Sequence, residues 1–201
     1  MANFTRVGYG QVEPNQLSAQ KTGQIYASLP LDSAVDVLQN GEFMYYDYKT
    51  GTVTADATVG EPMLVFNEIK LYEPYWQTSY KDFAMIRVGD NYVTSRLATE
   101  TYGDGATNVG APDANHTEYG YRMDGIAPRL FKTNIGDIYT TNMVKTGVEY
   151  EVGDLLAPVK DTTSNTLVLE EAAGTTGMLW QVAKVYTMPD GQPGLKLQRV
   201  Q

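Results

Sequence analysis

The residues that could do chemistry in this chain concentrate between residues 100 and 128. The single histidine, His116, lies close in sequence to Asp113 and Glu118. A Ser-His-Asp triad or a metal site needs its histidine held in place by a second group. The surrounding Gly-Ala-Pro-Asp-Ala-Asn sequence does not suggest a rigid frame, so we expect an exposed loop histidine without a catalytic role.

Paired carboxylates could act as the acid and base of a glycosidase, and tyrosines could stack on sugar rings. However, neighbours such as Tyr45 and Tyr46 must point to opposite faces of a strand, so they do not form one stacking surface. No acidic residue lies in a recognisable catalytic sequence motif. The excess of 15 Tyr over 5 Phe favours half-exposed aromatic surfaces of the kind used in protein interfaces. The candidate carboxylates are Glu68, Asp82, Asp104, Glu118 and Asp124.

The other site types find little support. The absence of cysteine excludes disulfides, thiol catalysis and cysteine metal sites. The Gly-Asp pairs at 89–90, 136–137 and 153–154 are too far apart for one metal-binding loop, and we interpret them as turns. The glycines at 8–10 and 103–105 lack the helix and lysine of a phosphate-binding loop. We therefore predict no enzyme activity, no cofactor, no metal site and no small-molecule substrate.

A net charge of −9 argues against a nucleic-acid partner, which requires clustered Lys and Arg. No apolar run approaches the length of a membrane span. The N-terminus, Met1–Gly10, lacks the apolar core of a signal peptide. We expect a protein made in a cytoplasm, or packaged from one, with no membrane partner.

The pattern of turns and β-branched residues predicts a mostly β fold of barrel-like or sandwich-like units. Asn40-Gly41 is a strong hairpin signal inside residues 33–48, and a second tight turn is expected at residues 49–51. A long Gly-rich loop is expected between the two β-units. The predicted organisation is an extended N-terminal arm over 1–30, β-units over 31–99 and 129–201, and the loop over 100–128; alternatively, 31–201 form one compact domain.

The two predicted β-units resemble each other. Gly60–Tyr72 can be laid on Gly174–Tyr186 at one constant offset, which places Phe66 on Trp180. Each copy is then predicted to contain, in order, a turn, a strand, a turn, a strand, a Gly turn and a long strand. This indicates an internal duplication, with chance similarity as the alternative. Two shorter matches accompany it: Gly51-Thr52 with Asn165-Thr166, and Gly41-Glu42 with Gly153-Asp154.

Residues 1–30 are rich in Gly, Gln, Asn and Ser, with scattered apolar residues. We predict an arm that becomes ordered against a neighbour, with a disordered tail as the alternative. The partner-binding residues of the arm would be Phe4, Val7, Tyr9 and Ile25. Deleting the arm is expected to leave the melting temperature nearly unchanged and to weaken attachment to the partner.

Four phrases resemble a known family: Val37–Asp47, Ile135–Asn142, Val152–Val159 and Val182–Gln192. Their apolar-Gly-Asp-strand units are similar to those of tailed-bacteriophage virion proteins, in particular capsid decoration (cement) and head-fibre-base proteins. The resemblance covers about half of the chain.

The resemblance implies a non-enzymatic viral structural protein that binds the outer surface of a phage capsid and stabilises the shell or anchors a fibre. It implies the major capsid protein as partner, a homo-oligomer on the shell, and location in a virion assembled in the host cytoplasm. The alternative function is a carbohydrate-binding β-module of a phage fibre or a bacterial glycan-handling protein. A small β-barrel hydrolase is a third, weaker alternative.

Overall fold

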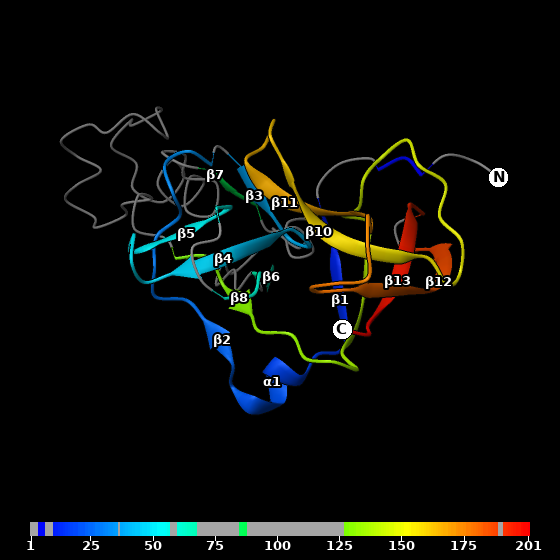
Figure 1. Cartoon of the computed structure of the whole chain (residues 1–201), viewed down its shortest axis with the longest axis horizontal. Coiled ribbons are helices and arrows are strands. Elements are labelled where there is room, and N and C mark those ends of the chain that lie inside the picture. The colour runs from blue at the N-terminus through cyan, green and yellow to red at the C-terminus, as the bar shows by residue number, and fades with distance from the viewer. Residues whose placement is uncertain are drawn as a thin grey trace, which may run out of the picture.

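The structure is a computed structural model of the chain, and β-strands dominate it (Figure 1). It describes residues 4–6, 10–35, 37–56, 60–67, 85–87, 127–188 and 191–201. Within these ranges, helix occurs only as the short α1 (Ser18–Thr22). The prediction of a mostly β chain is confirmed.

Most of the described strands belong to one eleven-stranded antiparallel sheet that curls into half a barrel (Figure 1). A separate two-stranded sheet pairs β3 (Val37–Gln39) with β7 (Met85–Arg87), and β5 (Thr52–Thr54) pairs with β4 (Phe43–Asp47) beside the main path. The path of the large sheet runs through β1 (Val12–Gln16), β9 (Ile138–Thr141), β13 (Pro193–Arg199), β12 (Trp180–Thr187), β10 (Leu155–Asp161), β11 (Thr166–Glu171), β4 (Phe43–Asp47), β6 (Met63–Val65), β8 (Leu130–Phe131) and β2 (Ile25–Tyr26).

One face of this sheet carries the core. Leu197 of β13 lies opposite Val182 of β12 on one side and Tyr139 of β9 on the other, and all three are fully buried. The buried ring of Trp180 contacts the rings of Tyr139 and Phe43, with centroid distances of 4.9 and 5.9 Å. Because β4 and β9 lie far apart along the sheet, these ring contacts close the curl of the half-barrel.

The Asn40-Gly41 hairpin prediction is wrong. β3 pairs with β7, whereas β4 pairs with β5, β6 and β11. A type I′ turn needs positive φ at both central residues, but only Gly41 has it, with φ of 92°. The Asn40 side chain instead bonds across to Asn67, accepting its N–H at 2.8 Å and donating to its carbonyl at 3.4 Å.

The two predicted β-units share the geometry of their first hairpin. Asp47 closes β4, and its Oδ1 accepts the N–H of residue 49 at 2.8 Å; Asp161 closes β10 and accepts the N–H of residue 163 at the same distance. The last turn residue is left-handed in both, with φ of 73° at Gly51 and 54° at Asn165. The sequence match of Gly51-Thr52 with Asn165-Thr166 therefore reflects an equivalent turn.

Strand pairing is also equivalent, although the sequence match fails at the third strand. β4 lies between β5 and β6 as β10 lies between β11 and β12. Val65 and Val182 occupy equivalent positions in the third strand of each unit, because each exchanges two backbone hydrogen bonds with the Gly turn that precedes the first strand of its unit. The equivalence of Phe66 with Trp180 is therefore wrong, because the connection to the third strand is longer in the second unit. Since β11 pairs with β4, the two units share one sheet.

The described part of residues 1–30 lies against the body of its own chain, which differs from the predicted arm. β1 pairs with β9, and β2 pairs with β8. Leu17 and Ala19 are buried in the core. The sequence did not indicate this, because β1 contains Pro14 and polar residues and its pairing partner lies over a hundred residues away. The predicted loop over 100–128 falls almost wholly outside the described residues.

Candidate interaction surface

Three tight turns in this chain have the same construction, at residues 39–42, 134–137 and 151–154. In each, the fourth residue is Glu or Asp, and its carboxylate accepts the first residue's N–H at 2.7, 2.9 and 2.7 Å. The third residue is a glycine with φ of 92°, 94° and 104°. The expectation that Gly-Asp pairs form turns is confirmed at 136–137 and 153–154; the pair at 89–90 lies outside the described residues.

A neighbouring strand clamps each turn through two further hydrogen bonds. The glycine N–H donates to a strand carbonyl at 2.8–2.9 Å, and the N–H of that strand residue donates back to the carbonyl of the acidic residue at 2.8–2.9 Å. Four hydrogen bonds, counting the one from the fourth N–H to the first carbonyl, thus hold each turn. The clamping residues are Val65, Arg199 and Val182.

The side chain at the second position is buried in one of these turns and exposed in the other two. Asn40 is 3% exposed, whereas Ile135 is 72% exposed and Val152 is 67% exposed. Both exposed residues are β-branched and therefore have few rotamers to lose. A turn held by four hydrogen bonds presents such a side chain in a fixed position, which would suit insertion into a partner's pocket. We call Ile135 and Val152 the turn-tip residues.

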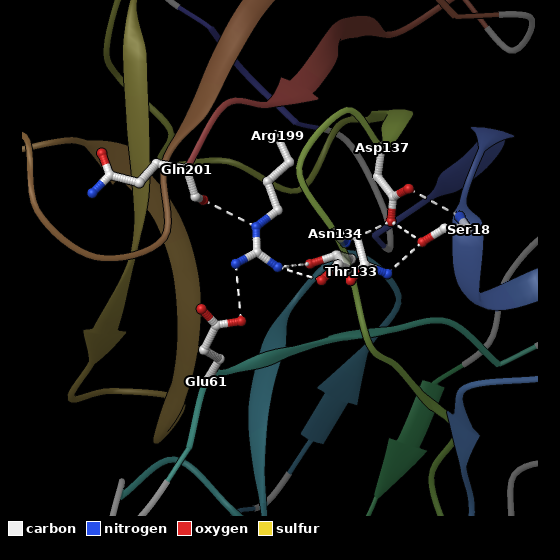
Figure 2. A network of polar contacts seen from close by, with 7 residues as sticks. All are labelled: Ser18, Glu61, Thr133, Asn134, Asp137, Arg199 and Gln201. Atoms are coloured by element: carbon white, nitrogen blue, oxygen red, sulfur yellow. Dashed lines mark hydrogen bonds and ion pairs between the residues drawn. The ribbon is translucent and has the colours of Figure 1, made fainter. Parts of the chain in front are cut away.

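A polar network holds the turn beneath Ile135, as Figure 2 shows. Asp137 accepts from the Ser18 N–H at 3.0 Å and from the Ser18 hydroxyl at 2.9 Å, in addition to the Asn134 N–H. The Asn134 amide donates to the Ser18 hydroxyl at 2.7 Å. This buried carboxylate therefore joins the turn to the start of α1.

Arg199, which clamps the same turn, has its own set of partners (Figure 2). Its guanidinium donates to the Thr133 carbonyl and, at 3.0 Å, to the Thr133 hydroxyl. It also donates to Gln201 O at 3.0 Å and pairs with Glu61 at 2.9 Å. Arg199 is buried, so these bonds compensate for the desolvation of its charge.

The turn below Val152 has acidic surroundings. Burial raises the pKa of the Tyr150 hydroxyl well above its usual value, and the negative charges of Glu170, Glu171 and Asp154 raise it further. The Tyr150 hydroxyl donates to the Lys145 carbonyl at 2.8 Å.

The predicted partner-binding residues do not form one exposed surface. Phe4 is buried, and its ring meets that of Tyr150 edge-on with centroids 5.7 Å apart. Ile25 is half-buried and pairs with Phe131. Val7 and Tyr9 lie outside the described residues. The sequence missed the turn-tip residues, although both precede the Gly-Asp pairs that it singled out.

Three tyrosines form an aromatic row. Tyr46 lies between Tyr26 and Tyr48, with ring centroids 5.3 and 5.2 Å away. Tyr48 is 75% exposed, and the Tyr46 hydroxyl accepts the Ser28 N–H at 3.1 Å. Tyr46 belongs to β4, and Tyr48 follows directly after the end of that strand, where its ring meets the ring of Tyr46 edge-on.

The histidine and the carboxylates that the sequence analysis considered for catalysis all lie outside the described residues; they are Glu68, Asp82, Asp104, Asp113, His116, Glu118 and Asp124. Among the residues that are described, no group of three or more His, Asp or Glu is arranged to hold a metal ion. The described part also contains no helix long and apolar enough to cross a membrane.

Comparisons with known proteins returned no relative: no family model, no curated protein and no solved structure matches this chain.

Proposed function

We propose that this protein is a non-enzymatic structural component of a tailed-phage virion, which binds the outer surface of the capsid and stabilises the shell or anchors a fibre. Its partner is the major capsid protein, and several copies occupy the shell. The observation that carries the proposal is the pair of turn-tip residues, Ile135 and Val152, exposed on turns held by four hydrogen bonds each. Two of the four segments that resemble cement proteins, Ile135–Asn142 and Val152–Val159, begin at these turn-tip residues.

The physical logic of this proposal is avidity. Two small apolar contacts per chain give modest affinity, because a single truncated anchor typically contributes about 1–2 kcal/mol. Many copies on one symmetric shell raise the overall strength of attachment without new contacts. Because turns 134–137 and 151–154 share their backbone geometry, they suit a partner that repeats one pocket.

The test is co-sedimentation of the purified chain with purified phage shells that lack it. We expect saturable binding, reduced roughly tenfold in affinity by Ile135→Ser and by Val152→Ser. Tyr48→Ser is the matched control, since Tyr48 is equally exposed but lies in the aromatic row. No pelleting of the wild-type chain at micromolar concentration would contradict the proposal.

The aromatic row favours a second candidate function, carbohydrate binding. A tyrosine ring that is exposed and supported by a neighbouring ring in edge-on contact, as Tyr48 is by Tyr46, can hold the apolar face of a sugar. On this alternative, Tyr48→Ser abolishes binding to a glycan array, whereas Ile135→Ser and Val152→Ser leave it intact. The same three variants therefore separate the two functions.

A further inference from the structure

Strand β12 is paired along the whole of one edge but along only part of the other. On the first edge, its pairing with β13 runs from the beginning of the strand to its end. On the second edge, β10 pairs with it only at Trp180 and Gln181, and turn 151–154 bonds to Val182. Within the described residues, no strand pairs with residues 183–187 on this second edge. We call residues 183–187 the open edge of β12.

The backbone of the open edge has the geometry to accept a further strand. Just beyond it, the Met188 N–H donates to the Gln192 carbonyl at 2.7 Å, which directs this N–H towards β13. Backbone groups of successive residues in an antiparallel strand point to alternate sides. The N–H and C=O groups of Val185 and Thr187 therefore point away from β13, where an extended segment could hydrogen-bond to them.

On one face of the sheet, Val185 extends a row of buried side chains. Leu195 of β13 lies opposite Thr141 of β9 on one side and opposite Val185 of β12 on the other. Directly opposite residues share one face of a sheet. Leu195 and Thr141 are fully buried, whereas Val185 is 42% exposed. A strand added at the open edge would continue this row, and an apolar residue opposite Val185 would cover it.

The neighbouring row, on the other face of the sheet, carries two positive charges. Lys184 of β12 lies directly opposite Lys196 of β13, an arrangement that is unfavourable because like charges repel. Among the described residues, no ion pair joins either lysine to an acidic side chain. Glu13 of β1, further along the same row, accepts the Tyr186 hydroxyl at 2.7 Å. On a chain with a net charge of −9, this lysine pair is a local site for a negative group.

The lysine pair also argues against a second copy of this chain as the occupant. Two-fold pairing of β12 with β12 of another copy would bring two lysine pairs side by side on one face of the joined sheet. Like charges at that distance would weaken the contact. An acidic side chain on the added strand would instead lie beside both lysines.

We propose that the open edge of β12 binds an extended segment of a partner protein in which acidic and apolar residues alternate. Backbone hydrogen bonds to Val185 and Thr187 hold this segment, an apolar residue covers Val185, and an acidic residue lies beside Lys184 and Lys196. The site contains neither turn-tip residue and does not depend on the proposed function.

Titration of the nitrogen-15-labelled full chain with three synthetic peptides tests this proposal. The first is a capped heptapeptide of alternating valine and glutamate, and the second has lysine in place of glutamate. The third is the glutamate peptide N-methylated at every residue, which keeps the side chains and removes the backbone donors. At about 1 mM, we expect the glutamate peptide to shift the amide signals of residues 183–187. It should bind roughly tenfold more tightly than the lysine peptide at low salt, and the N-methylated peptide should not bind.

Variants of the chain separate this site from general charge attraction. Lys184→Gln and Lys196→Gln should each weaken binding of the glutamate peptide by roughly threefold, as expected for one cross-strand charge pair. Lys21→Gln is the matched control, because Lys21 is an exposed lysine on α1, and its affinity should equal that of the wild type. The absence of shifts at residues 183–187, or equal affinities for the glutamate and lysine peptides, would overturn the proposal. So would wild-type affinity in both Lys184→Gln and Lys196→Gln.

Discussion

Two buried charged residues, Glu42 and Arg199, have opposite consequences for stability. Arg199 has four hydrogen-bond acceptors around its guanidinium, whereas Glu42 has two donors and an incompletely compensated charge. A buried charge stabilises a fold only when hydrogen bonds and counter-charges replace the lost water. The two sites therefore respond differently to substitution.

Glu42→Gln should stabilise the chain at pH 8 and lose that advantage at acid pH. Because the folded pKa of Glu42, about 7, lies above the usual 4.5, the wild-type chain loses stability as the pH rises through this window. The gain at pH 8 is at most about 3 kcal/mol. Urea unfolding at pH 5 and pH 8 measures it, and a variant less stable than wild type at both pH values would contradict this account.

Arg199→Met should destabilise the chain by about 2–4 kcal/mol, since it leaves the Thr133 carbonyl without a donor from this side chain. Glu61→Gln is the matched control. Glu61 is largely exposed, so its charge should contribute less than about 1 kcal/mol. Equal losses of unfolding free energy in the two variants would show that the Arg199 network is not as described.

At the scale of elements, local pattern predicted several of the turns, but the Asn40-Gly41 hairpin prediction was wrong because β3 pairs with the distant β7 rather than with β4. The Gly-Asp turns and the hairpin at Gly51 follow from residue types at fixed spacing, and both were found. The pairing of β3 with β7 and of β1 with β9 joins segments far apart in the chain, and no local pattern encodes it. The turn-tip residues were missed because exposure is a tertiary property; the apolar residue before each Gly-Asp pair was their only signal.

The equivalent turns allow one matched test. Gly41→Ala and Gly153→Ala both place alanine at positive φ, which costs about 1–2 kcal/mol. At Gly41 the new Cβ would also lie 2.6 Å from Met143 Cβ and 2.7 Å from Thr141 Oγ1, whereas nothing lies within 4 Å at Gly153. We expect Gly41→Ala to lower the free energy of unfolding clearly more than Gly153→Ala; equal losses in denaturant unfolding would exclude the close packing of this turn.

For the deletion of residues 1–30, the structure predicts a different effect on the melting temperature than the sequence alone. Deleting residues 1–30 removes β1, α1 and β2 together with the buried side chains of Phe4 and Leu17. Each of these large side chains contributes about 1.5–3 kcal/mol by burial. We therefore expect the melting temperature to fall by roughly 10 °C or more, and an unchanged value in calorimetry would restore the arm as an independent segment. That these residues also bind a partner stays a prediction.

At the scale of the whole molecule, a half-barrel built from two similar units presents small apolar tips on an acidic body. A net charge of −9 keeps free copies apart, because like charges repel at long range. On the proposed function, short-range apolar contacts hold each copy on the shell despite this repulsion. Attachment through the turn-tip residues should therefore persist in high salt, which screens charges but strengthens apolar burial.

The most direct test of the central claim is a binding isotherm of the purified chain on phage shells that lack it. Bound protein is measured after sedimentation for the wild type, Ile135→Ser, Val152→Ser and Tyr48→Ser. We expect saturation at a fixed number of copies per shell, with weaker binding in the two turn-tip variants and unchanged binding in Tyr48→Ser. Wild-type protein that remains in the supernatant at every concentration would contradict the proposed function, and equal binding of all four proteins would contradict the assignment of the contact surface.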